Sequence, residues 1–207
     1  MAKKSLATIQ AAITKAQINS AEAHRRVSDQ KGDYTPDGAQ KHFNGWRKQF
    51  GVDAAINDAR KDVQAWREGA KSAAANMRAG FFPTAKDSNA QLAAEMQLQR
   101  ILGRGELDQT KALALISGME PSPARTLLVE EAMARGIVSD ESIEGLLQST
   151  SEDYHDAVIR SRQADSIANA ADAQLNYLER QGENMNTRQS ELEKMDVLEM
   201  PGAEVEY

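Results

Sequence analysis

The fold is decided by residues 52–77, which have the sequence VDAAINDARKDVQAWREGAKSAAANM. Apolar and small residues recur there at alternating steps of three and four: Val52, Ile56, Ala59, Val63, Trp66, Ala70, Ala73 and Met77. This spacing places them on one face of a helix and is the seam pattern of a coiled coil. Because alanine occupies many of the positions, the seam buries little apolar area, at roughly 25 cal/mol per Å². We therefore expect this helix to need partner helices.

Two further stretches repeat the pattern, one near the N-terminus and one in the last third of the chain. Their seams are Leu6, Ile9, Ile13, Ala16, Ser20, Ala23 and Val27, and Tyr154, Ala157, Ser161, Ala164, Ala168, Ala171, Leu175 and Leu178. Glycine and proline in residues 31–38 separate the first two helices. The simplest arrangement is a long antiparallel helical hairpin over residues 1–80. Its second helix runs from about residue 37 to residue 79, with glycines that leave a kink or interruption open.

The middle of the chain has a different character, with short helices and tight turns. Gly80-Phe-Phe-Pro83 stops the long helix, and residues 79–88 form a linker. Short helices are predicted at 89–102, 107–117, 122–135 and 140–148, the last with Ser139 as its N-terminal cap. These helices carry the densest apolar content of the chain, which predicts a compact module over residues 89–149. A long C-terminal helix within 150–199 and an acidic tail at 200–207 follow, so the predicted fold class is all-α.

Composition excludes several classes of protein. Aromatic residues are only 5% of the 207, which argues against β-sandwiches and barrels, and the absence of cysteine excludes disulfides, thiolate zinc sites and thiol nucleophiles. No apolar run approaches the length that is needed to cross a bilayer as a helix, so no membrane span is expected.

Charge is distributed unevenly along the chain. Residues 1–86 contain 15 Lys and Arg against 8 Asp and Glu, a net charge of +7, whereas residues 87–207 contain 10 against 23, a net charge of −13. This asymmetry favours head-to-tail self-association or contact with two oppositely charged partners. Drift of charge along long solvated helices explains the same counts equally well.

No set of residues for catalysis emerges. Glu152 and His155 form a Glu-x-x-His pair, but a di-iron site needs a second copy and further glutamates. Gly103-Arg-Gly105 lacks the third glycine and the preceding strand of a dinucleotide fingerprint. We therefore predict a non-enzymatic protein with no cofactor and no metal site.

Residues 41–61 leave two interpretations open. Phe43, Trp46 and Phe50 alternate with basic residues, as in surfaces that bind phosphates and stack bases, and the cations of such a surface would be Lys41, Arg47, Lys48, Arg60 and Lys61. The competing interpretation is an apolar stripe that packs on the first helix or on a partner subunit. We favour the stripe and keep nucleic-acid binding as the alternative function.

The residues expected to pack against a partner are large apolar positions of the seams and of this stripe. They are Ile13, Phe43, Trp46, Phe50, Ile56, Val63, Trp66, Met77, Leu175 and Leu178.

The N-terminal part of the chain also resembles a known class of protein. An alanine-rich N-terminal helix, the turn Tyr34-Thr-Pro-Asp-Gly38 and the stretch NDARKDVQAW at 57–66 are similar to small head-region proteins of tailed bacteriophages. The resemblance covers roughly residues 5–80 and carries no residue-level function. It implies a non-enzymatic virion protein that scaffolds, lines or decorates a capsid or belongs to its neck. Its partners would be itself, a capsid protein or a portal protein, and its location the virion or the host cytoplasm during assembly.

Overall fold

The computed structural model describes residues 5–30 and 34–188, and within them all regular structure is α-helical. This confirms the predicted all-α class. The helices of these residues are α1 (Leu6–Ser28), α2 (Pro36–Gln49), α3 (Val52–Phe81), α4 (Ser88–Leu102), α5 (Gln109–Gly118), α6 (Pro123–Ala134), α7 (Asp140–Thr150) and α8 (Glu152–Arg180).

Side-chain caps explain where most of these helices begin. A Ser, Thr or Asp precedes the helix, and its side-chain oxygen accepts the backbone N–H three residues further on, which satisfies one of the unpaired donors of the first turn. The caps of this kind are Ser5, Thr35, Asp87, Asp108, Ser122, Ser139 and Ser151. The predicted cap at Ser139 is confirmed, and the four short helices lie within two residues of their predicted ends.

Within the described residues the chain divides into two compact units. The first unit comprises residues up to Ala70 together with those from Arg160 onward, and the second unit comprises Lys71–Ile159. Each of the two longest helices contributes to both units, because α3 crosses the first boundary and α8 crosses the second.

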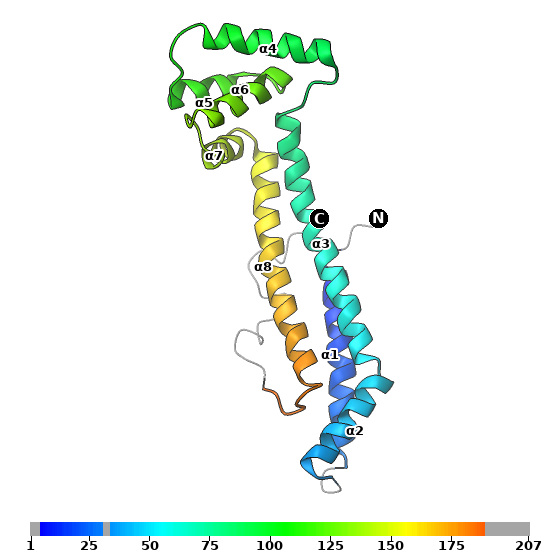
Figure 1. Ribbon diagram of the computed structural model, residues 1–207. Helices are drawn as coiled ribbons and strands as arrows, with labels where there is room; N and C mark the ends of the chain where they lie inside the picture. Colours follow the sequence, from blue (N-terminus) through cyan, green and yellow to red (C-terminus); the bar gives the residue numbers. More distant parts are fainter. Residues whose placement is uncertain (1–4, 31–33, 189–207) are drawn as a thin grey trace. The chain divides into compact units, whose positions relative to one another are not determined.

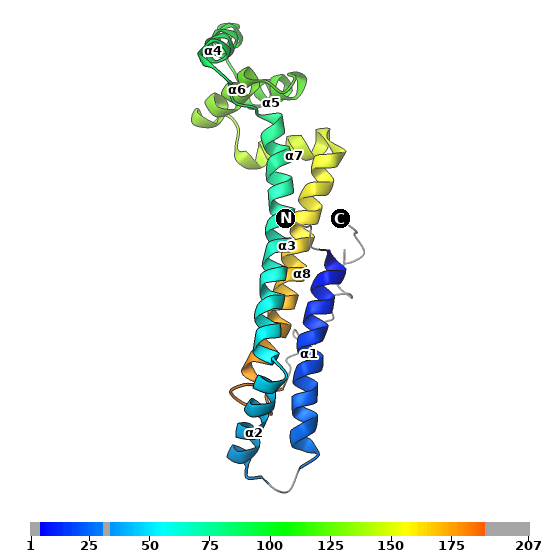
Figure 2. The same ribbon diagram turned by 90° about the vertical axis from the view of Figure 1, so that its right-hand side faces the viewer.

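The first unit is built on three helices that run side by side: α1, residues 52–70 of α3, and residues 160–180 of α8 (Figures 1 and 2). Ion pairs show that α3 and α8 are antiparallel, since Arg60 pairs with Glu179 at 2.6 Å and Arg67 pairs with Asp165 at 2.5 Å. The shared core consists mostly of seam residues, and its alanines let the helix axes approach closely. Its buried members are Ile9, Ile13, Ala16, Val52, Ala55, Ile56, Ala59, Val63, Trp66, Ala164, Ile167, Ala168, Ala171, Leu175 and Leu178.

This arrangement differs from the predicted division into a hairpin at 1–80 and a separate C-terminal helix at 150–199. Residues 160–180 of α8 complete the bundle, because a pair of alanine-rich seams leaves apolar surface that a third helix covers. The helix ends at Arg180 and is followed by turns to Arg188. The predicted continuation from 189 to 199 and the tail at 200–207 lie outside the described residues.

The predicted single helix over 37–79 is interrupted at Phe50 and Gly51, which separate α2 from α3. Gly51 has a φ of +64°, a left-handed conformation that only glycine adopts without a steric penalty. The break allows α2 to pack on the end of α1, where Phe43 is buried against Ala23 and Val27.

Replacing Gly51 by alanine is expected to lower the free energy of unfolding of the first unit by about 1 kcal/mol, because the added Cβ is strained at positive φ. Gly45, inside α2, is the matched control: both glycines have open space for a Cβ, but Gly45 has no positive φ. Gly45→Ala is expected to raise the free energy of unfolding by about 0.5–1 kcal/mol. Urea unfolding followed by tryptophan fluorescence measures both changes, and equal shifts in the two variants would contradict the argument.

The second unit contains α4 to α7 with the ends of α3 and α8 that lie within Lys71–Ile159. Its core joins the short helices, and the buried members are Ala112, Ile116, Leu128, Val129, Ala132, Val138, Ile143, Leu147, Tyr154 and Val158. Helix α4 lies along α6 (Figure 1) and has a single buried residue, Ala94.

Candidate interaction surface

Most residues predicted to pack against a partner are instead used inside the chain. Six of them are buried in the three-helix core: Ile13, Ile56, Val63, Trp66, Leu175 and Leu178. Phe43 is buried between α1 and α2, and Trp46 and Phe50 are half-buried beside it. Met77 is 42% exposed. The seams therefore find their partner helices within the chain, and except for Met77 these side chains leave little apolar surface for another molecule.

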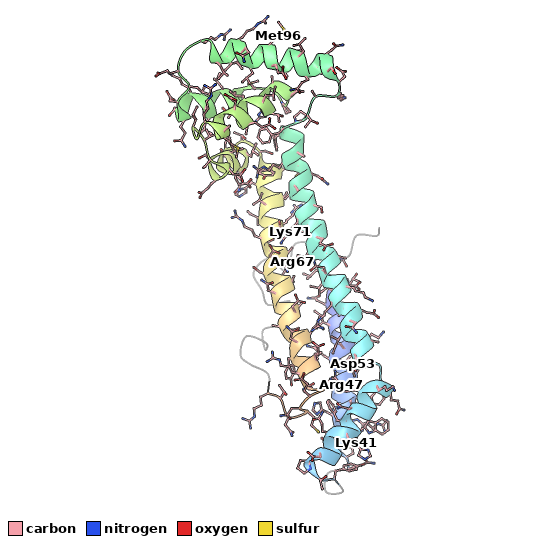
Figure 3. All side chains as sticks on the ribbon, in the orientation of Figure 1. Lys41, Arg47, Asp53, Arg67, Lys71 and Met96 are labelled. Atoms are coloured by element: carbon pink, nitrogen blue, oxygen red, sulfur yellow. The ribbon has the colours of Figure 1, made fainter. Side chains whose placement is uncertain are left out.

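Arg47 ties three helices together at one end of the bundle. Its side chain is only 3% exposed, and its Nη1 donates a 2.6 Å hydrogen bond to the carbonyl oxygen of Leu178 in α8. Its Nη2 pairs with the Asp53 carboxylate of α3 at 2.5 Å, and the two residues lie side by side in Figure 3. The guanidinium carbon also lies 5.7 Å from the centre of the Phe43 ring. Arg47 thus holds α2 to both α3 and α8.

A second polar contact fixes the residues that follow α8. The Gln40 side chain of α2 donates to the carbonyl oxygens of Gln181 and Gly182, at 3.3 and 3.1 Å, and accepts the backbone N–H of Met185 at 2.6 Å. Ser20, the polar member of the α1 seam, donates to the Gln181 side chain at 2.9 Å. The chain is therefore anchored to the first unit at least as far as Met185.

His24 lies in the same region, with its ring centre 4.3 Å from that of Phe43. Burial lowers the pKa of His24, a hydrogen bond with Gln181 opposes this shift, and the charge of Arg47 adds to it. Both the burial and the neighbouring cation favour the neutral imidazole.

The basic residues proposed for nucleic-acid binding do not form one surface. Arg47 is buried, and the Arg60 guanidinium is bound by Glu179 and by the side chain of Asn176 at 2.6 Å. Lys61 lies 3.7 Å from Asp58, whereas Lys41 and Lys48 are exposed. Because two of the five cations are neutralised or buried inside the bundle, the stretch presents less positive charge than its sequence suggests.

Among residues 5–30 and 34–188, no group of three or more His, Asp and Glu side chains is placed to hold a metal ion. In the same residues no helix is both long enough and apolar enough to cross a membrane.

The Phe81-Phe82 pair, predicted to lie in a linker, is part of the second unit. Both rings pack against its core, and the Arg125 guanidinium lies 5.8 Å from the Phe81 centre and 5.4 Å from the Phe82 centre. Burial lowers the pKa of Arg125, and the nearby charge of Glu120 opposes that shift. The aromatic pair therefore connects the end of α3 to the start of α6.

The most exposed apolar surface of the second unit lies on α4. Leu92 and Met96 are 58% and 52% exposed, and each is two residues from the buried Ala94. Two residues correspond to about 200° around a helix, so both side chains project away from α6; Figure 3 labels Met96 there. A shallow hollow of about 470 Å³ adjoins them and is lined by Ala93, Met96, Gln97, Arg100, Ile101 and Arg104.

We call Leu92, Ala93, Met96, Gln97, Arg100 and Arg104 the α4 surface. Leu92, Met96 and Arg100 follow one another along α4 at steps of four residues, and Arg104 lies in the turn after the helix, which ends at Leu102. No carboxylate within the described residues pairs with Arg100 or Arg104, whereas Arg78 and Arg135 of the same unit pair with Asp140 and Glu131. The four-residue steps are visible in the sequence, but the exposure of this side of α4 is seen only in the structure.

Comparison with models of protein families, with curated proteins and with solved structures finds no match for this chain. The resemblance to phage head-region proteins stays a prediction.

Proposed function

We propose that this chain is a non-enzymatic structural protein that assembles with further copies of itself through the α4 surface, as part of a tailed-phage particle. A capsid or portal protein would be the shell on which the copies gather, and the virion, or the host cytoplasm during assembly, would be the location. One observation carries the proposal: with the three seams used internally, α4 still exposes Leu92 and Met96 side by side.

Exposed apolar side chains on neighbouring turns are typical of contact surfaces, whereas single exposed ones occur on every protein. Ile18 is such a single residue, 62% exposed on α1. Full burial of a Leu or Met side chain contributes about 1.5–3 kcal/mol. The free energy that two such residues contribute to one contact is modest. In an assembly each copy makes several contacts at once, so the overall binding is much tighter than that of a single contact.

The association with a phage particle rests on three supports. Residues 5–80 resemble head-region proteins, the charge is split between the two halves of the chain, and α1 forms a bundle of alanine-rich helices with parts of α3 and α8. Charges that differ in sign along one chain favour repeated contacts between copies. Nucleic-acid binding through residues 41–61 is less favoured, because Arg47 is buried and Arg60 is paired.

Replacing Leu92 and Met96 together by glutamine is expected to weaken self-association by on the order of 100-fold, since about 3 kcal/mol of apolar burial is lost. Glutamine keeps the helix propensity and the charge of α4 unchanged. Light scattering over a tenfold range of concentration should show the wild-type mass rising and the double variant remaining a monomer.

The matched control is Ile18→Gln, which removes an equally exposed side chain from α1 and should associate as the wild type does. Circular dichroism checks that helix content is unchanged in both variants. Wild-type association by the Leu92/Met96 variant, or a wild type that is monomeric throughout, would overturn the proposed self-assembly. Charged substitutions at Val63 or Trp66 would not serve this purpose, because both residues lie in the core.

A further inference from the structure

We infer that the α4 surface binds residues 191–200 of a second copy of this chain, so that copies associate head to tail. This inference rests on the proposed function and names the partner at the same surface.

The α4 surface calls for a ligand that is both apolar and acidic. Leu92 and Met96 provide the apolar end, and Arg100 near the end of α4 and Arg104 in the turn after it provide two positive charges. From Leu92 to Arg100 the surface extends about 12 Å along the helix, at 1.5 Å per residue. A matching ligand would be a short amphipathic segment whose carboxylates flank its apolar residues.

Residues 191–200, ELEKMDVLEM, have this composition. Leu192, Met195 and Leu198 recur at steps of three, the spacing of one helix face, and the acids among them are Glu191, Glu193, Asp196 and Glu199. A helix of ten residues would extend about 15 Å, which is long enough to cover α4 from Leu92 to Arg100. The segment belongs to the part of the chain beyond Arg188, which contains six acids and one lysine.

The path of the chain favours the tail of a second copy over the chain's own tail. Met185 is hydrogen-bonded to Gln40 in the first unit, and six residues from there to Glu191 reach at most about 20 Å. Helix α8 runs about 30 Å from Arg160, its first residue in this unit, to Arg180. Arg180 therefore lies far along α8 from the point where the chain enters the first unit from the second, the unit to which α4 belongs.

A contact between a tail and a different surface on the next copy is heterologous, so it produces either a closed ring or an open chain of copies. Part of its strength would come from exposed ion pairs, which salt screens over about 10 Å at 0.1 M. We therefore expect the self-association to weaken as the salt concentration is raised.

Two full-length variants test the inference by complementation. The α4 variant carries Arg100→Glu and Arg104→Glu, and the tail variant carries Glu191→Lys, Asp196→Lys and Glu199→Lys. Each alone should be monomeric in light scattering, because every possible contact then brings like charges together. An equimolar mixture should associate again, because the acidic tail of the α4 variant meets the intact α4 surface of the tail variant, and the new lysines of the tail variant meet the new glutamates of the α4 variant.

The control variant carries Lys86→Glu and Lys111→Glu, two exposed lysines elsewhere in the second unit, and should associate as the wild type does. A mixture that stays monomeric would overturn docking between copies. Wild-type association by either charge variant alone would overturn the role of these charges. If the Leu92/Met96 glutamine variant is monomeric in that case, the proposed function stands and only this inference fails.

Discussion

Replacing Leu175 by alanine is expected to lower the free energy of unfolding of the first unit by about 3 kcal/mol. The Leu175 side chain is fully buried in α8 against the seams of α1 and α3. Its truncation removes apolar burial and leaves a cavity, and changes of this kind cost roughly 2–5 kcal/mol. Urea unfolding followed by tryptophan fluorescence measures the effect, since Trp46 and Trp66, the two tryptophans of the chain, both lie in this unit.

The same measurement distinguishes a three-helix bundle from a hairpin at 1–80 whose core does not involve α8. If α8 were independent of the hairpin, Leu175→Ala would leave the fluorescence transition unchanged. Ile18→Ala on the outer face of α1 is the control, and it is expected to change the free energy of unfolding by no more than about 0.5 kcal/mol. A shift of equal size in the two variants would contradict the described core.

Replacing Arg47 by methionine is expected to lower the free energy of unfolding of the first unit by about 2–3 kcal/mol. Methionine keeps much of the side-chain volume but leaves the Leu178 carbonyl oxygen without its charged donor, and such hydrogen bonds contribute about 1.5–3 kcal/mol. The pair with Asp53 adds little, because that carboxylate is 68% exposed and screened by water. Fluorescence-detected urea unfolding again measures the change.

Lys48→Met is the control for this prediction, since Lys48 is the adjacent basic residue of α2 and is exposed. It should change the free energy of unfolding by less than about 0.5 kcal/mol. Equal losses from the two variants would mean that general removal of positive charge, rather than the bond to α8, explains the result.

The faces of the helices were predictable from sequence, but their pairing was not. Every position of the predicted α1 seam from Ile9 to Val27 is buried. Periodicity identifies a buried face because it depends only on the residues of one helix. It does not identify the face of another helix against which this face packs, because alanine-rich seams differ little from one another. The assignment of α8 to the bundle depends on fit between residues far apart in the chain.

For the candidate functional residues too, the sequence does not show which residues from distant parts of the chain come into contact. Arg47 looked like a surface cation, and its acceptor lies 131 residues further along the chain. On α4, apolar residues occur around much of the helix, so the sequence alone does not show that Ala94 faces inward and Leu92 and Met96 face outward. Gly45, Gly51 and Gly69 all lie in the stretch predicted as one helix, and of these three only Gly51 has a positive φ.

The first unit is formed by two separate parts of the chain, and this determines the order in which the two units can fold during translation. Residues 71–159 fall between the two parts of that unit, and at about 5–20 residues per second the ribosome needs on the order of 5–20 s to synthesise them. The second unit is contiguous in sequence, so it can fold as it emerges from the ribosome. The seams of α1 and α3 stay exposed until α8 has been synthesised. In that interval, the exposed seams of nascent chains on neighbouring ribosomes of one messenger RNA can pack against each other. Misassembly in the cell is therefore expected to begin with the N-terminal helices rather than with the later, inserted part.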